Sequence, residues 1–128
     1  MIRVDVTKQS NYPVSAARIK KKLADFFEKR GIVSDAEVSV AIVGEKKMLS
    51  ISKKYLKDNK LHNVLSFTPD ETKGDFIYPP DDTLHLGEIM ICHPLVVAEA
   101  KIEGKLIEDK TLELIEHGAM HLLGIHHA

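Results

Sequence analysis

The segment HGAMHLLGIHH, residues 117–127, contains four of the seven histidines and decides how this part of the chain folds. His117 and His121 are four residues apart, so on a helix both side chains lie on one face, with Cβ atoms about 5–6 Å apart. Gly124 tolerates the left-handed backbone that ends a helix and turns the chain. The spacing therefore predicts a helix that ends at this glycine, after which the chain turns back and brings His127 to the other two histidines.

Three imidazoles in this arrangement suit a zinc ion, with Zn–N distances of about 2.0–2.1 Å. We predict one zinc ion per chain, bound by His117, His121 and His127, although imidazole also admits nickel or another divalent ion. Structural zinc sites favour cysteine ligands, and Cys92 is the only cysteine of the sequence. A catalytic site is therefore expected, whose open fourth position holds a water molecule acidified to a pKa of about 7. The sequence identifies no catalytic residue beyond these ligands. The alternative to a metal site is that the three histidines are solvated residues on the surface.

Upstream of this segment, predicted strands and helices follow one another along the chain. Periodicity of two predicts a strand over 2–6, and further strands are expected over 36–44, 63–67 and 84–91. Helical spacing predicts helices over 13–31, 45–56 and 94–103, and a last helix from about 108 to about 123. Gly31 and Gly104 are expected to end two of them, and residues 68–82, with three prolines and many acids, are expected to be a loop.

This order predicts an α+β fold, in which a small mixed sheet is packed with helices and a zincin-like helix carries the metal site. The 128 residues suit one domain, residues 1–128, without internal repeats. No apolar run approaches the roughly 20 residues that a membrane span needs. With no apolar segment typical of a signal peptide and no disulfide partner for Cys92, the cytoplasm is the expected location.

Charge is distributed unevenly along the chain, although the formal net charge is only -1. Residues 1–60 contain 14 lysines and arginines against 7 acids, whereas residues 61–128 contain 4 against 12. Such asymmetry is compatible with a face that binds a polyanion. The alternative is that the lysines merely solvate the outer faces of helices.

A zinc peptidase is the first functional class to consider, because the histidine spacing matches the metzincin pattern H-E-x-x-H-x-x-G-x-x-H. The glutamate that acts as general base in those enzymes is replaced by Gly118, which cannot accept a proton. The methionine turn that follows the pattern in metzincins is also missing. Both departures disfavour a peptidase.

Three segments resemble a different family in order and spacing, over essentially the whole chain. HGAMHLLGIHH resembles the H-G-x-L-H-L-x-G-x-D-H motif of the YbeY family of bacterial endoribonucleases. NVLSF at 63–67 resembles the T-[DN]-V-L-S-F segment of that family, and LGEIMI at 86–91 resembles its L-G-D-I-x-I strand.

The resemblance implies a metal-dependent endoribonuclease that acts on single-stranded RNA in the bacterial cytoplasm. It implies a role in ribosomal RNA maturation, mainly of the small subunit, and in ribosome quality control, with the small ribosomal subunit as partner. It also implies a mixed four-stranded sheet, with His117, His121 and His127 as the zinc ligands. A non-catalytic ribosome-assembly factor, in which the metal only staples the turn after the last helix, is the alternative.

The sequence departs from the family pattern at three positions near the expected site. Leu56 stands where the family usually has an arginine thought to engage RNA, His62 replaces a threonine, and His126 replaces an aspartate. Leucine cannot contact a phosphate, so this role is either lost or moved to the nearby Lys57 and Lys60, which supply positive charge without the bidentate geometry of arginine. Our candidate substrate contacts are Lys57, Lys60, His62, Asn63 and Ser66.

Three further polar residues have two interpretations each. His85 and His93 are expected at the surface, with contact to a metal ligand as the alternative. Glu88, which matches the aspartate of the family's L-G-D-I strand, either contacts a ligand imidazole or lies on the surface of an edge strand.

Overall fold

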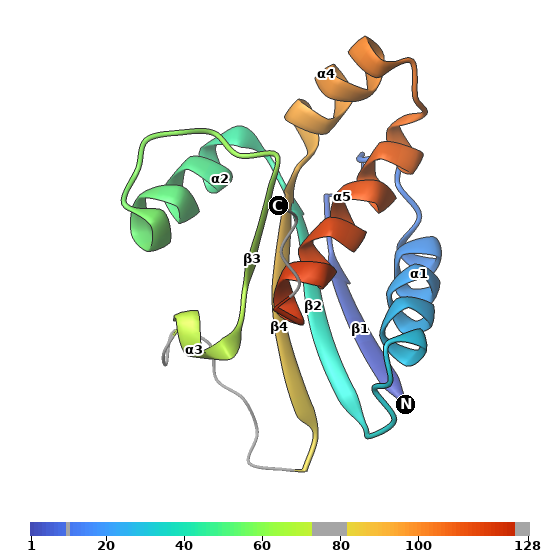
Figure 1. The fold of residues 1–128 in the computed structure, drawn as a ribbon. Helices are drawn as coiled ribbons and strands as arrows, with labels where there is room; N and C mark the ends of the chain where they lie inside the picture. Colours follow the sequence, from blue (N-terminus) through green and yellow to red (C-terminus); the bar gives the residue numbers. More distant parts are fainter. Residues whose placement is uncertain (10, 73–81, 125–128) are drawn as a thin grey trace.

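A computed structural model describes residues 1–9, 11–72 and 82–124 of the chain (Figure 1). Four strands and several helices alternate along these residues. In chain order they are β1 (Ile2–Thr7), α1 (Ala16–Lys29), β2 (Ala36–Val43), α2 (Glu45–Ile51), the π-helical turn η1 (Ser52–Leu56), β3 (Val64–Phe67), α3 (Pro69–Thr72), β4 (Leu84–Cys92), α4 (His93–Glu103) and α5 (Ile107–Leu122).

The four strands form one mixed sheet in the spatial order β1-β2-β4-β3. β1 pairs with β2 and β2 with β4 in parallel, whereas β3 runs antiparallel to β4. The sequence prediction of an α+β fold with a small mixed four-stranded sheet is therefore confirmed. β4 is a central strand, because it lies between β2 and β3 (Figure 1).

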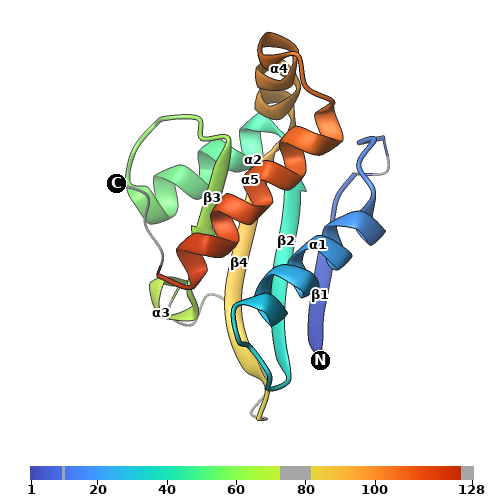
Figure 2. The same ribbon diagram turned by 45° about the vertical axis from the view of Figure 1, so that its right-hand side comes forward.

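The two faces of the sheet are covered by different helices. α1 and α5 lie side by side over one face, and α2 lies on the opposite side (Figures 1 and 2). The larger core forms under α1 and α5, and its fully buried side chains include Leu23, Phe27, Val38, Ile89 and Ile115. A smaller cluster packs beneath α2 and consists of Met48, Ile51, Phe67, Met90 and Cys92. Alternation along β4 explains this division, since neighbouring residues of a strand face opposite sides.

The ends of the helices follow from local hydrogen bonds and backbone conformation. α1 begins after Ser15, whose Oγ accepts a hydrogen bond from the Arg18 N–H at 3.2 Å, and not at Pro13 as the sequence predicts. Ser15 determines this end because its side chain satisfies an N–H that the first helical turn leaves without a partner. Gly31 follows α1 with φ +92° and Gly104 follows α4 with φ +66°, in agreement with their predicted role.

The predicted helix over 45–56 is not uniform. Its first part is the α-helix α2, and its second part widens into the π-helical turn η1. The buried Ser52 at this junction donates its hydroxyl to the Met48 carbonyl at 3.0 Å, a bond that competes with regular helix hydrogen bonding. Lys57 then ends the turn with a left-handed φ of 55°.

Of the three polar residues with two interpretations, His93 and Glu88 are buried and His85 is half-buried. His93 is 8 % exposed and stacks on Tyr12 with ring centroids 4.1 Å apart, and burial lowers the pKa of its imidazole. The Nδ1 of His85 lies 2.6 Å from Glu37 Oε1 between neighbouring strands. Glu88 pairs with Phe67 and therefore faces the α2 side of the central strand β4, away from α5. The surface predictions are thus wrong for His93 and Glu88.

None of the helices in the described part of the chain combines the length and apolarity needed to cross a membrane.

Candidate functional site

The two described histidines of the predicted metal motif project from the same face of α5 into one pocket. His117 is exposed, and the His121 side chain is 41 % exposed. The pocket has a volume of about 350 Å³ and lies between the second half of α5 and β3. It is lined by Leu56, Asn63, Val64, Leu65, Ser66, Phe67, Glu71, His117, Gly118 and His121. We call it the histidine pocket.

Gly118 lets α5 lie close against the central strand. A Cβ at this position would be 3.0 Å from Ile89 Cγ2, closer than ordinary packing permits. Position 118 therefore faces the sheet, whereas His117 and His121 face the pocket. A glutamate at this position would point into the core, so the geometry that metzincin peptidases need at their second motif residue is absent from this helix.

Gly87 brings a second segment close to the same end of α5. Its φ is +133°, and a Cβ there would overlap the Phe67 carbonyl oxygen and lie 2.8 Å from Leu122 Cδ2. Only glycine adopts such a backbone conformation readily. The missing side chain therefore lets the end of β3 and the last turn of α5 meet over β4.

The short helix α3 begins directly after β3 and carries a carboxylate into the histidine pocket. Glu71 Oε1 accepts hydrogen bonds from Thr68 N at 2.9 Å and Thr68 Oγ1 at 3.1 Å, and it lies 3.8 Å from His121 Nε2. Our sequence prediction of a loop over 68–82 is wrong for Pro69–Thr72. The pattern Thr-x-x-Glu at 68–71 is a capping box, the signal from which this helix could have been found.

Two of the candidate substrate contacts lie on the wall of the histidine pocket. Ser66 pairs with Ile89 on β4 and therefore faces α5. Asn63 lies just before β3, where its Nδ2 donates to both carboxylate oxygens of Glu99 on α4, at 2.9 and 3.0 Å. Leu56, which departs from the family pattern, lines the same pocket and is 43 % exposed.

The other three candidates are not among the described residues that line this pocket. Lys57 and Lys60 are exposed in the segment that follows η1. The Nε2 of His62 lies 3.2 Å from Asp58 Oδ2. Burial alone would raise the pKa of Asp58, but hydrogen bonds from the Lys60 N–H and from His62 outweigh it and lower this pKa. These residues therefore lie beside the site, on the segment that leads into β3.

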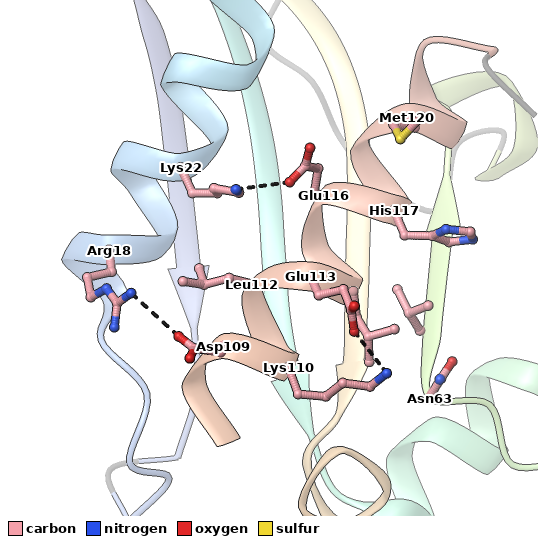
Figure 3. Close-up of a pocket in the computed structure, with 12 residues that line it drawn as sticks. Arg18, Lys22, Asn63, Asp109, Lys110, Leu112, Glu113, Glu116, His117 and Met120 are labelled. Carbon is pink, nitrogen blue, oxygen red and sulfur yellow. Dashed lines mark ion pairs between the residues drawn. The ribbon is translucent and has the colours of Figure 1, made fainter. Parts of the chain in front are cut away.

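A larger hollow of about 780 Å³ adjoins the histidine pocket along α5. Its wall includes His117 and Asn63, which both pockets share. Figure 3 shows His117 pointing from α5 toward β3, while Lys22 of α1 points toward Glu116 on the other side of the helix. The Lys22–Glu116 ion pair has a length of 2.9 Å, and Arg18 pairs with Glu108 at 2.8 Å. Arg18 and Lys22 therefore join α1 to α5, whereas Lys110, the third cation of this hollow, pairs with Glu103 of α4.

The donor atoms of the histidine pocket fit a divalent cation, because zinc accepts imidazole nitrogen and carboxylate oxygen. Within residues 1–9, 11–72 and 82–124, however, no group of three histidine, cysteine, aspartate or glutamate side chains already meets at metal-binding distances. His127, the third predicted ligand, and His126 lie outside the described residues.

Comparison with known proteins places the chain in a family of endoribonucleases. Residues 5–128 match the family model described as Endoribonuclease YbeY, and the chain belongs to this family. The resemblance seen in the three sequence motifs is thereby confirmed.

Relatives with this description occur in several bacteria. The relative from Bartonella quintana is 35 % identical over 136 residues, which cover 99 % of this chain and 81 % of the relative. The relative from Acinetobacter baumannii is 32 % identical, covering 87 % and 69 %, and that from Dehalococcoides mccartyi is 30 % identical, covering 89 % and 76 %. The solution structure of TM1509 from Thermotoga maritima has a similar fold, with a TM-score of 0.61 at 24 % identity over 100 % of this chain and 75 % of that one.

Proposed function

We propose that this protein is a zinc-dependent endoribonuclease that cleaves single-stranded RNA. We further propose that it acts in the cytoplasm on ribosomal RNA, chiefly of the small ribosomal subunit, during its maturation and in ribosome quality control. Membership of the endoribonuclease YbeY family supports the reaction class. The observation that carries the proposal is that His117 and His121 share one pocket with the polar residues Asn63 and Ser66.

His117, His121 and His127 would hold one zinc ion per chain, or nickel or another divalent ion in its place. When bound, the ion supplies a Lewis acid that stabilises negative charge on the phosphate undergoing cleavage. Gly118 keeps the second half of α5 close to the sheet, so the helix presents His117 and His121 to the pocket from a fixed backbone.

Polar groups of β3 and its approach would bind the RNA strand next to the histidines. The Asn63 side-chain amide nitrogen already donates to Glu99. The amide oxygen Oδ1 would therefore be the atom that accepts a hydrogen bond from a ribose hydroxyl. The ribose 2′-hydroxyl is the group by which proteins distinguish RNA from DNA. Ser66 would contribute a hydroxyl that either donates or accepts.

Exposed lysines of α2, η1 and the following segment would attract the phosphates of the strand. They are Lys46, Lys47, Lys53, Lys54, Lys57 and Lys60. Binding through such contacts releases counterions, so the affinity for RNA should fall steeply as the salt concentration rises.

The decisive experiment compares the metal-loaded protein with a His121→Ala variant on a labelled single-stranded RNA. We expect the variant to lose at least about a hundredfold in cleavage rate, because one ligand of the proposed ion is removed. His121 is partly exposed, so the variant should fold normally. The Asp70→Asn variant, altered at an exposed acid on α3, serves as the control and should cleave like the unaltered protein.

Equal cleavage by the protein and by His121→Ala would reveal a contaminating nuclease and contradict the proposal. A duplex of the same sequence should be cleaved much more slowly, since the proposal requires single-stranded RNA.

One observation favours a non-catalytic ribosome-assembly factor as the second candidate. Leu56 lines the histidine pocket where the family usually has arginine, so this position offers no positive charge to a phosphate. The second candidate predicts RNA binding without cleavage, together with a large fall in melting temperature when a chelator removes the metal.

A further inference from the structure

We propose that Glu99 is a positioning residue that fixes the orientation of the Asn63 amide, so that this part of the histidine pocket accepts a hydrogen-bond donor and rejects an acceptor. The donor is the 2′-hydroxyl of an RNA strand. The inference rests on the proposed endoribonuclease function and deepens it, because it names the residue that decides which feature of the ribose is recognised. Glu99 itself lies on α4 and is not among the described residues that line the two pockets.

The main chains of Asn63 and Glu99 are both held in place by the fold. The Asn63 carbonyl accepts a hydrogen bond from the Cys92 N–H at 2.9 Å, which fixes the approach to β3 against the end of β4. α4 begins directly after Cys92, and the buried Val96 and Ala100 anchor its inner face. Glu99 lies three residues after Val96, so on the helix it stands next to this inner face. Its side chain therefore starts from a fixed backbone.

The contact between the two side chains determines which way the amide points. Asn63 Nδ2 donates to Glu99 Oε1 at 2.9 Å and to Glu99 Oε2 at 3.0 Å. An ionised carboxylate accepts hydrogen bonds and donates none, whereas an amide has a donor side and an acceptor side. The nitrogen must therefore face Glu99, and the oxygen Oδ1 points away from it. A neutral glutamine in place of Glu99 carries both kinds of group and would satisfy either orientation of the amide.

The amide lies where a strand bound beside the histidines would meet it. Asn63 and His117 both line the histidine pocket and the larger hollow next to it. Figure 3 shows the Asn63 side chain and the His117 imidazole on the same side of α5, next to β3. The strand would therefore meet an amide oxygen that can only accept. The 2′-hydroxyl of RNA can donate to this oxygen, whereas the 2′ position of DNA carries no such group.

The negative charge of Glu99 also favours a positioning role. A carboxylate close to an RNA strand repels its phosphates, and thus weakens binding unless it has another task. Orientation of the amide is such a task, and a neutral side chain that both donates and accepts could not perform it. The alternative is that the contact between Asn63 and Glu99 only ties β3 to α4. Such a tie would affect stability and would not affect which ribose group the site selects.

The test uses the metal-loaded full chain and a series of labelled single-stranded RNAs, each with one 2′-hydroxyl replaced by fluorine. Fluorine occupies the same position but cannot donate a hydrogen bond. At one position other than the cleavage site, we expect the replacement to raise KM about fivefold and to leave kcat unchanged, as one lost hydrogen bond requires. In Glu99→Gln this KM ratio should fall below about two, because the amide can turn and present its N–H to the fluorine.

Two further variants separate orientation from stability. Glu28→Gln removes the same charge from an exposed position of α1 and should keep the ratio at about five. Asn63→Asp combined with Glu99→Gln exchanges the two groups without changing the total charge. The new amide on α4 then donates, and the new carboxylate before β3 presents only oxygen atoms to the RNA. This double variant should restore the ratio to about five.

The outcomes distinguish the inference from the function on which it rests. A KM ratio that is the same in Glu99→Gln and in the unaltered protein would overturn the inference and leave the proposed endoribonuclease function standing. The same conclusion would follow if fluorine raised KM at no position outside the cleavage site in the unaltered protein. If the unaltered protein cleaved no RNA, the proposed function would be wrong, and the inference with it.

Discussion

The two ends of α5 use their polar residues in opposite ways. At the first end, the Lys110 side chain is only 10 % exposed, and its Nζ lies 2.9 Å from both Glu103 Oε2 and Glu113 Oε2. Lys105 also pairs with both glutamates. At the other end, His117 and His121 are directed into an open pocket.

This difference separates the end of α5 that joins it to α4 from the end that lines the histidine pocket. Hydrogen bonds that Lys110 donates to Glu103 and Glu113 raise the pKa of Lys110 to about 12, so these charged groups join α4 to α5. The contact of Gly118 with Ile89 then fixes the middle of the helix on the sheet. With the backbone held in this way, His117 and His121 are presented to the histidine pocket.

The largest effect is expected from a substitution that disrupts the contact between Gly118 of α5 and Ile89. Gly118→Glu recreates the metzincin sequence pattern, yet it forces a charged side chain against Ile89. We expect it to lower the free energy of unfolding by at least about 3 kcal/mol, measured by urea denaturation. Met120→Glu, two residues further along at a partly exposed position, should cost much less. A stable Gly118→Glu variant that hydrolyses casein would refute this view of position 118.

A smaller effect is expected at the open end, where Leu56 faces the histidine pocket. Leu56→Arg adds a cation that can bind a phosphate with two hydrogen bonds, and we expect it to tighten RNA binding by about tenfold. Leu56→Gln, with a similar size and no charge, is the matched control. In a plot of the logarithm of the binding constant against the logarithm of the salt concentration, the slope for the arginine variant should be steeper by about one unit. No difference between the two variants would mean that RNA does not pass this position.

The smallest effect is expected at the ion-paired end. Lys110→Met should lower the free energy of unfolding by about 1 kcal/mol, because the two carboxylates are partly exposed and solvent screens the pairs. Lys101→Met, at an exposed position of α4, should change it by less than half of that.

The effect of Lys110→Met should also depend on pH. Hydrogen bonds from Lys110 and Lys105 lower the pKa values of Glu103 and Glu113 from 4.5, so their stabilisation is present above this pH and is lost as the pH falls through the lowered values. At high pH the loss begins above 10.5 and completes as Lys110 deprotonates near 12. An unfolding difference that stays constant from pH 7 down to pH 2 would contradict the role given to these pairs.

Regular features of the fold were accessible from the sequence because local rules govern them. The alternation of polar and apolar residues over 2–6 predicted β1, and Gly104 ended α4 with the left-handed backbone expected of it. The spacing of His117 and His121 likewise placed both side chains on one face of a helix. In each case, residues close in sequence determine the outcome.

Features that depend on distant contacts were not accessible in the same way. Glu71 lies near His121 because the end of β3 and the last turn of α5 meet over Gly87, and no local pattern encodes that approach. His93 is buried because the loop before α1 carries Tyr12 across it. The central place of β4, which gives Glu88 its burial, follows from the pairing of strands and not from its own residues.

The position of β4 also sets the order in which the molecule can be assembled during synthesis. β4 is the last strand in the chain, yet it pairs with both β2 and β3. A nascent chain released only as far as β3 can pair β1 with β2, but β3 has no neighbouring strand until β4 emerges. The histidine pocket needs β3, β4 and α5 together, so it can form only after β4 and α5 have both emerged.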